Sequence, residues 1–486
     1  MKKIFILMLS LLMIVSLFAC SQDSSNKTSS TSTTSISEKN TSTEQIELTP
    51  VTLTGNVTTI TLGDSIKIKG TGASAENNIV NITEAGNYSI SGKLENGQIV
   101  INCDKAEIYL ELAGVDITNA SGPAIYVADA KTTTIILKDG TTNNLTDGSA
   151  YKNSEMKAAL FSEDTLVIKG SGALNITGKY KHGIASDDEL TIDGGNIKIK
   201  SAVTDGMHAN DAILIDGGIL SINASSDGIE GENTVIVNKG SLTINATDDG
   251  IHAETILTIN GGTTNVTGSY EGIEGKTDII INNGIIRLKC DDDSVNAGQN
   301  LTINGGYLYA DCNGDGLDSN GNMTINGGDI TVFSGNNANG PIDIGDRNCT
   351  FIINGGTVFA TGGNMGINVS ENSKQYSMFI SSPIAANTLV NISSDNNEII
   401  TASMMKSSSL IFYSSDKLAS GSSYIISTGG SHSGESTDNV YSKGSYSKGT
   451  TLGSLTMNSK NVSYGNAGGG MGGWNDFAPG EGGRRP

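Results

Sequence analysis

The segment DGIEGENTVIVNKGSLTINATD, residues 227–248, is followed by a variant of itself, DGIHAETILTINGGTTNVTGSY, residues 249–270. Both segments are 22 residues long and begin with an acidic residue and Gly. The acidic residue recurs at a constant step of 22 residues, at Asp205, Asp227, Asp249, Glu271, Asp293 and Asp315, and Ser294 replaces Gly after Asp293. A repeat at this interval indicates a solenoid in which successive repeats stack on one another.

A second marker follows the repeat and is mostly succeeded by Gly-Gly, at Asp193, Asp216, Asn238, Asn260, Asn282, Asn304 and Asn326. Asn-Gly and Asp-Gly favour positive φ, so these positions are predicted to be turns, and apolar residues before them alternate with period two. We therefore predict an all-β chain. Its three short strands per repeat, here called a rung, form a right-handed parallel β-helix with about 22 residues per rung.

The β-helix is predicted to extend on both sides of the regular repeat and to cover residues 49–370. Residues 371–462 lose the repeat but keep strand-like alternation, and we expect a β-rich C-terminal cap that protects the open edge of the helix. The Ser/Thr-rich segment 20–48 is predicted to be a solvated tether, and the Gly-rich segment 463–486 a flexible tail.

The N-terminus has the features of an export signal. Lys2 and Lys3 precede a 16-residue apolar run, which is short for a membrane-spanning helix. The sequence Leu-Phe-Ala-Cys at residues 17–20 resembles the lipobox of bacterial lipoproteins, which implies removal of residues 1–19 and lipid attachment at Cys20. The alternative is an ordinary secretory signal with an incidental Cys. We expect the chain to be lipid-anchored at the extracellular face of the cell membrane.

The chain is strongly acidic, and its acidic residues are concentrated in one region. The chain has 51 Asp and Glu against 30 Lys and Arg, a net charge of −21, and this balance argues against nucleic-acid binding. Residues 205–318 hold 18 of the acids and 4 of the bases. Stacked carboxylates repel one another unless they bind a cation, so we predict calcium as a cofactor. The predicted ligands are Asp227, Glu230, Asp249, Glu271, Glu274, Asp292, Asp293, Asp315 and Asp318. Alternatively, these acids only cap turns and project into solvent.

His and Cys residues give weaker signals. His208 and His252 are predicted to lie in one column about 9.6 Å apart, which is too far to share a zinc ion, and we expect them to be exposed polar side chains. Cys290 and Cys312 fall in a column of small inward residues. Buried free thiols are predicted there, although the spacing would also permit a disulfide.

Several segments resemble a family of secreted bacterial carbohydrate-binding proteins, common in clostridia, that has a polysaccharide-lyase-like β-helix. The similar segments are Gly86–Gly92, Leu94–Ile99, Gly122–Ile125, Gly140–Asn143, the rungs themselves, Gly340–Asp343 and Ser420–Tyr424. The resemblance covers residues 50–460 approximately. It implies calcium binding and affinity for cellulose or an acidic, pectin-type polysaccharide, and it does not imply catalysis.

Large side chains at outward positions of the third strand predict where the sugar binds. The strand positions that carry small polar residues in early rungs change to Arg287, Lys289, Tyr307, Tyr309 and Phe333 in later ones. Tyr rings pack on the apolar face of sugars, and Arg forms a planar fork for a carboxylate. The alternative is ordinary cross-strand pairing.

Two other functions remain open at this point. A calcium-dependent polysaccharide lyase acting on uronates would use Arg or Lys as its base, and Arg287 and Arg347 are the Arg residues of the region predicted to fold. The sequence contains no evident nucleophile motif. A structural spacer or adhesin, in which the repeats only provide length, is the third reading. We rank a non-catalytic binding protein first, a lyase second and a spacer third.

Overall fold

The computed structural model describes residues 46–335, 339–345, 348–395 and 397–465. Cys20, the signal segment and most of the predicted tether and tail therefore lie outside the described residues. The described part is all-β, without a helix of any kind, and its coils stack into a β-helix of about 11 turns. No helix in these ranges is long and apolar enough to cross a membrane. The predicted fold class is confirmed.

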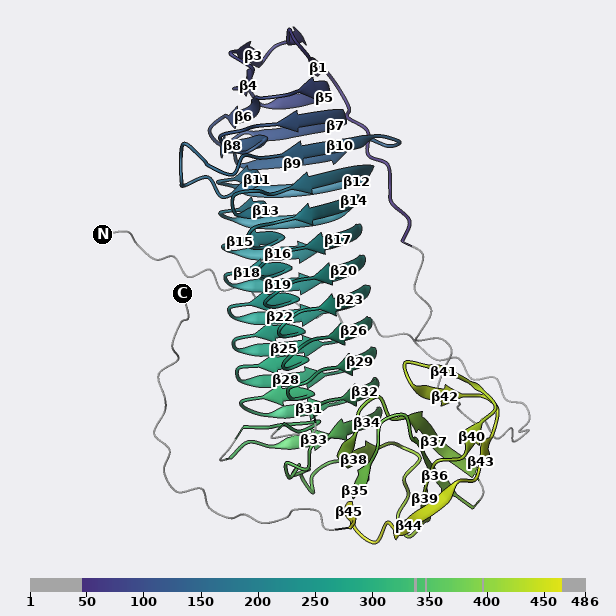
Figure 1. Ribbon diagram of the computed structural model, residues 1–486. Coiled ribbons are helices and arrows are strands. Elements are labelled where there is room, and N and C mark those ends of the chain that lie inside the picture. The colour runs from purple at the N-terminus through teal and green to yellow at the C-terminus, as the bar shows by residue number, and fades with distance from the viewer. Residues whose placement is uncertain (1–45, 336–338, 346–347, 396, 466–486) are drawn as a thin grey trace, which may run out of the picture. The chain divides into compact units, whose positions relative to one another are not determined.

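Figure 1 shows the coils stacked along one axis, with parallel strands of successive rungs in contact. One face is a 12-stranded sheet of β3 (Ala73–Glu76), β4 (Ile79–Ile82), β6 (Gln98–Asn102), β8 (Ile125–Asp129), β11 (Ala158–Ser162), β13 (His182–Ser186), β15 (Met207–Ala209), β18 (Ile229–Gly231), β21 (Ile251–Ala253), β24 (Ile273–Gly275), β27 (Val295–Ala297) and β30 (Leu317–Ser319).

The other strands of the coils form two columns of a second sheet, which has 25 strands when three strands of the C-terminal cap are included. The early strands β5 (Gly86–Leu94), β7 (Glu107–Thr118), β12 (Thr165–Thr177) and β14 (Glu189–Ser201) are long, and β2 (Lys67–Lys69) pairs with the edge of the shorter β1 (Val57–Leu62). The first column continues through β9 (Thr132–Leu137), β16 (Ala212–Ile215), β19 (Thr234–Val237), β22 (Ile256–Ile259), β25 (Asp278–Ile281), β28 (Asn300–Ile303), β31 (Met323–Ile325) and β33 (Phe351–Ile353). The second contains β10 (Thr142–Thr146), β17 (Ile219–Asn223), β20 (Ser241–Asn245), β23 (Thr263–Gly268), β26 (Ile285–Lys289), β29 (Tyr307–Asp311), β32 (Asp329–Phe333) and β34 (Thr357–Gly362).

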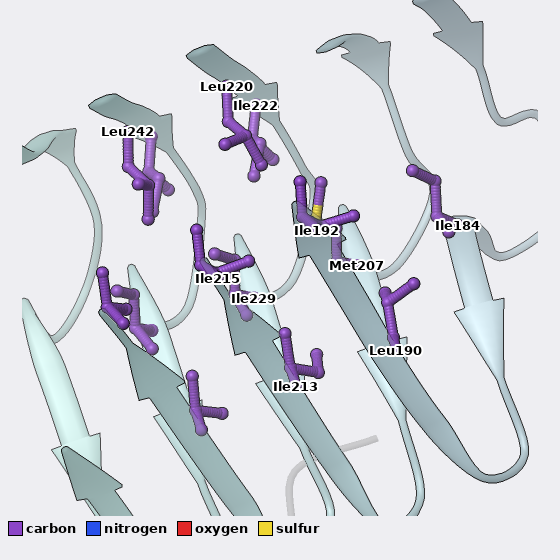
Figure 2. Close-up of a cluster of buried hydrophobic side chains, with 14 of the residues drawn as sticks. Ile184, Leu190, Ile192, Met207, Ile213, Ile215, Leu220, Ile222, Ile229 and Leu242 are labelled. Carbon is purple, nitrogen blue, oxygen red and sulfur yellow. The ribbon is translucent and has the colours of Figure 1, made fainter. Parts of the chain in front are cut away.

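The 22-residue step is visible directly in the strand register. Ile229 pairs with Ile251, and Ile251 pairs with Ile273, so equivalent residues of successive rungs lie side by side. Every second side chain points inward, and these apolar side chains form continuous buried stacks. Figure 2 shows part of this core, where Ile184, Met207 and Ile229 lie along one wall and Leu190, Ile192, Ile213 and Ile215 along another.

An amide ladder follows the second sequence marker. The Nδ2 atom of Asn260 donates to Oδ1 of Asn238 at 2.7 Å, and Asn282, Asn304, Asn326 and Asn354 repeat this bond rung after rung. The residue two positions after each marker is a Gly with positive φ, such as Gly262 at 77° and Gly284 at 115°. These turns therefore need Gly for its left-handed backbone, as predicted.

The Gly that follows each acidic residue has another role. Gly228 and Gly250 are not in the left-handed region, but a Cβ on Gly250 would lie 2.4 Å from the carbonyl oxygen of Gly272 in the next rung. Gly250 is therefore favoured by the close approach of the adjacent rung, whereas the equivalent position two rungs later holds Ser294.

The cap closes the C-terminal edge. Its strands are β35 (Ser377–Ile384), β36 (Leu389–Ser394), β37 (Asn397–Ser403), β38 (Ser408–Ser414), β39 (Ser423–Thr428), β40 (Ser431–His432), β41 (Glu435–Thr437), β42 (Val440–Ser442), β43 (Tyr446–Ser447), β44 (Thr450–Thr456) and β45 (Asn461–Tyr464). Strand β38 pairs antiparallel with the last strand of the second column, β34, so that the open edge acquires hydrogen-bond partners. This is the expected function of a cap.

Candidate functional site

The acidic residues of the 22-residue step lie one above another at one corner of the β-helix. We call Asp205, Asp227, Asp249, Glu271, Asp293 and Asp315 the acidic corner. The backbone N–H of Asp249 donates to Oδ1 of Asp227 at 2.7 Å, and that of Asp315 donates to Oδ1 of Asp293 at 2.6 Å. Each bond links residues one rung apart, so the backbone itself positions these carboxylates in a column.

A second polar column lies three residues further along each rung. Each member pairs in register with the next on neighbouring strands of the 12-stranded sheet. The members are His208, Glu230, His252, Glu274, Asn296 and Asp318. Both predicted columns therefore exist and lie next to each other. Asp292 is the exception among the predicted metal ligands, since it belongs to neither column and lies in the turn before Asp293.

The prediction that His208 and His252 are exposed is wrong. Their exposed fractions are 6% and 7%, because the neighbouring rungs and carboxylates cover the rings. The Nδ1 atom of His252 lies 2.8 Å from Oδ2 of Asp249 and 2.8 Å from Oε2 of Glu274. These imidazoles are integral parts of the acidic columns.

The pKa values of the acidic corner are strongly perturbed. Burial and the Asp249 carboxylate raise the pKa of Asp227 to about 8, and burial and Glu274 raise that of Glu271 to about 8. Burial also raises the pKa of Asp293 to about 6, and burial together with Asp293 raises that of Asp318 to about 7. A cation bound beside these carboxyl groups would stabilise their ionised forms and so lower their pKa values.

Around His252 the shifts differ between the two carboxylates that it contacts. Burial alone would lower the pKa of His252, but hydrogen bonds to Asp249 and Glu274 outweigh it and raise the pKa to about 11. Burial raises the pKa of Glu274, yet His252 and Lys276 lower it to about 2. The pKa of Asp249 is still raised to about 6, because burial outweighs its hydrogen bond to His252.

Four groups of side chains in the described ranges have ligand atoms within 4.8 Å of one another and could hold a metal ion. Three of them combine residues of the two columns, and the fourth contains Asp227, Asp248 and Asp249. The groups are His182–Asp205–His208, Asp249–His252–Glu274, Asp205–Asp227–Glu230 and Asp227–Asp248–Asp249. Of the predicted ligands, Asp227, Glu230, Asp249 and Glu274 are members, whereas Glu271, Asp292, Asp293, Asp315 and Asp318 occur in none of these groups.

The sequence prediction missed five members of these groups, His182, Asp205, His208, Asp248 and His252, of which His208 and His252 were predicted to be exposed. Asp205 begins the 22-residue series and Asp248 directly precedes Asp249, so both carried a usable signal. His182 did not, because Ala185 pairs with His208 and the rung before it is therefore 23 residues long. His182 occupies the acidic-corner position in that rung, next to Asp205.

The predicted sugar-binding face is covered over much of its area. Tyr307 and Phe333 are 7% and 0% exposed, and Phe333 packs with Phe359 and with cap residues in one apolar cluster. The Nε atom of Arg287 lies 2.9 Å from Oδ2 of Asp438 in the cap. The prediction of an exposed face is therefore wrong at these positions, because the cap packs against the strand surface that the side chains occupy.

Two remaining members of that face differ from each other. The hydroxyl of Tyr309 accepts a hydrogen bond from Nδ2 of Asn439 at 3.1 Å, so its polar end is engaged by the cap. Lys289 is exposed. The large side chains thus act mainly as the docking surface of the cap.

A shallow hollow lies instead on the outer face of the first column. It has a volume of about 290 Å³ and is lined by Asp278 and Ile280 of β25, Asn300 and Thr302 of β28, Thr324 of β31 and Asn322, which precedes β31. Asn300 donates through Nδ2 to Oδ1 of Asp278 at 2.9 Å, and Asn322 donates to Oδ1 of Asn300 at 3.1 Å. The hollow thus presents amide, hydroxyl and carboxylate groups repeated at the spacing of the rungs.

The buried thiols agree with the prediction. Cys290 and Cys312 are free, and their Sγ atoms lie 3.4 Å from the carbonyl oxygen of Asp293 and 3.3 Å from that of Asp315. They fill the small-residue column behind the acidic corner.

Comparison with known proteins adds a family likeness. A protein from Acetivibrio thermocellus described as a carbohydrate-binding domain-containing protein is 35% identical over 157 residues, which cover 30% of this chain and 55% of the relative. The chain thus spans about half the length of this curated relative. A solved structure of the polysaccharide lyase-like protein from C. thermocellum, a gadolinium derivative, is 29% identical and covers 50% of this chain and 97% of that chain, with a TM-score of 0.42. Residues 76–316, which include the rungs that carry the acidic corner, match the family of carbohydrate-binding domain-containing proteins.

Proposed function

We propose that this chain binds polysaccharide through its β-helix, with calcium bound at the acidic corner, and that it does so without catalysis. The observation that carries the proposal is the extent of the family match, residues 76–316, which contains both the acidic corner from Asp205 to Asp315 and part of the polar hollow. The glycan classes proposed are cellulose and acidic, pectin-type polysaccharide.

Calcium is proposed first at Asp227, Asp248 and Asp249. Their carboxylate oxygens lie within 4.8 Å of one another, and no imidazole belongs to this group. Calcium takes six to eight oxygen ligands, which carboxylates, turn carbonyls and water can supply together. Glu271, Asp293, Asp315 and Asp318 extend the same oxygen-rich surface toward the cap, and their raised pKa values favour a cation there as well.

The polar hollow is the proposed glycan contact, in place of the face beneath the cap. Sugars are recognised by amide, hydroxyl and carboxylate groups placed at fixed positions, and the hollow repeats such groups over three rungs. Arg287, one candidate base for an eliminating enzyme, is bound to Asp438 and lies 5.3 Å from the ring centroid of Tyr307. This engagement argues against Arg287 as the base, and Arg347 lies outside the described residues.

We also propose that the chain is held at the extracellular face of the membrane by a lipid on Cys20. The support is the lipobox-like sequence at residues 17–20. Replacing Cys20 by Ala should release the protein from the membrane fraction of the producing cells, and retention of the Cys20→Ala variant there would contradict the proposal.

Replacing Thr302 by Met tests the hollow. A methionine side chain would fill it with apolar atoms and leave the net charge unchanged, so retention by cellulose and polygalacturonate should weaken by about tenfold or more. Co-sedimentation and affinity electrophoresis measure this effect. The matched control is Thr243→Met, which places the same side chain on an exposed strand position of the other column. Equal retention of both variants would place the glycan elsewhere.

A further inference from the structure

Three of the four His residues of the chain lie in or beside the acidic columns, and two of them converge on one carboxylate. The Nδ1 atom of His182 lies 2.8 Å from Oδ2 of Asp205, and the Nδ1 atom of His208 lies 3.6 Å from the same oxygen. Their rings are stacked, with centroids 4.4 Å apart. Strands β13 and β15, which carry the two imidazoles, are neighbours in the 12-stranded sheet (Figure 1).

The ligand atoms of His182, Asp205 and His208 all lie within 4.8 Å of one another. In a tetrahedral zinc site with metal–ligand bonds of about 2.0–2.2 Å, adjacent ligand atoms are roughly 3.4 Å apart. The separations of 2.8 Å and 3.6 Å within this group bracket that value. The Oε2 atom of Glu230 lies 3.0 Å from Nδ1 of His208, but Glu230 is not a member of the group.

The surroundings hold one imidazole in the orientation that a metal ligand needs. The Nε2 atom of His208 lies 3.3 Å from Oδ1 of Asn210 and 3.6 Å from Oε1 of Glu232. Metal-binding His residues commonly donate the other ring N–H to such an oxygen, which leaves the first nitrogen free to bind the metal. His182, Asp205 and His208 are 8%, 3% and 6% exposed, so the ligand atoms are held by their neighbours in the fold.

We propose that His182, Asp205 and His208 form a site for a divalent transition metal of the zinc class, separate from the oxygen-only calcium site. Two imidazole nitrogens and a carboxylate oxygen, with water as the fourth ligand, suit zinc, whereas calcium takes oxygen ligands. The Asp249–His252–Glu274 group differs, since it has a single imidazole and Lys276 lies 2.6 Å from Glu274 as a competing cation.

The test uses the full chain, prepared without a histidine tag and titrated with Co²⁺ in excess calcium, which occupies the oxygen-only ligands. We expect about one equivalent of Co²⁺ to produce the visible ligand-field absorption of a four-coordinate site. His182→Asn and His208→Asn should each weaken Co²⁺ binding more than about 100-fold, since even an outer partner of a ligand contributes about 10- to 100-fold. The control is His432→Asn, which removes an imidazole that pairs with Glu398 in the cap.

Retention of the absorption in both column variants, or no absorption in the unsubstituted chain, would overturn the proposal. If a variant fails to fold, X-ray absorption of the unsubstituted chain loaded with Zn²⁺ decides instead. Scattering from about two imidazoles in a shell of nitrogen and oxygen supports the site, and a sulfur shell or an all-oxygen shell contradicts it. Because the readout is the metal alone, failure of this site would leave the proposed glycan binding untouched.

Discussion

When a chelator keeps this protein metal-free, its free energy of unfolding should fall as the pH rises from about 4 to about 8. Asp227 and Glu271 have folded-state pKa values of about 8, far above the values of free carboxyl groups. Between the unfolded-state pKa of about 4 and the folded-state pKa of about 8, the folded chain holds protons that the unfolded chain has released, so raising the pH favours unfolding. His252 adds to the loss above about pH 6.5, because its folded pKa is raised to about 11.

Below about pH 4 the dependence should reverse. The pKa of Glu274 is lowered to about 2, so the stability that its ion pairs provide is lost as the pH falls toward that value. The metal-free protein should therefore be most stable at mildly acidic pH. One unit of pKa shift corresponds to about 1.4 kcal/mol. Because the shifted groups interact with one another, their contributions do not add, and the free energy of unfolding should fall by a few kcal/mol between about pH 4 and pH 8.

Calcium should restore most of this stability at pH 8. A ligand that binds only the folded state at 100 times its dissociation constant stabilises it by about 2.7 kcal/mol. Chemical denaturation at pH 5 and pH 8, with calcium or chelator, measures both effects. Asp227→Asn should flatten the profile in chelator, whereas Asp104→Asn, at an exposed site, should not. Identical stability with and without calcium at pH 8 would mean that the acidic corner is a set of solvated turns.

Replacing Gly250 by Ala should destabilise the fold by about 3 kcal/mol or more. The new Cβ would lie 2.4 Å from the carbonyl oxygen of Gly272 and 2.7 Å from Cγ2 of Val266. The backbone oxygen cannot move without disturbing the strand register of the next rung. Guanidinium denaturation measures the loss, with Gly63→Ala as the control, because no atom lies within 4 Å of a Cβ at Gly63. A change below about 0.5 kcal/mol for Gly250→Ala would contradict the assigned role of close approach.

The columns of the β-helix could be predicted from sequence because each rung repeats the same contacts with its neighbours. Once Ile229 is assigned inward, the 22-residue step places Ile251 and Ile273 inward as well, and it stacks Asp227 on Asp249. The amide ladder and the buried thiols follow from the same periodicity. His182 could not be placed in this way, because its rung is one residue longer.

The covering of the predicted sugar face could not be predicted from the repeat. Arg287 meets Asp438 across 151 residues, and Tyr307 meets the same carboxylate across 131. The cap has no periodicity that relates its residues to the rungs. Large side chains at outward strand positions can bind a ligand, but they can equally well be the surface on which another part of the chain packs. The local sequence does not distinguish the two.

Calorimetric titration of the calcium-loaded and the metal-free chain with oligogalacturonate and cello-oligosaccharide determines whether this chain is a calcium-dependent glycan-binding protein. We expect measurable binding of at least one of the two glycans by the calcium-loaded chain, and we expect binding of the acidic glycan to weaken or disappear in the presence of a chelator. Absence of binding to both glycans by a calcium-loaded chain whose circular dichroism shows an intact β-sheet fold would contradict the proposed function.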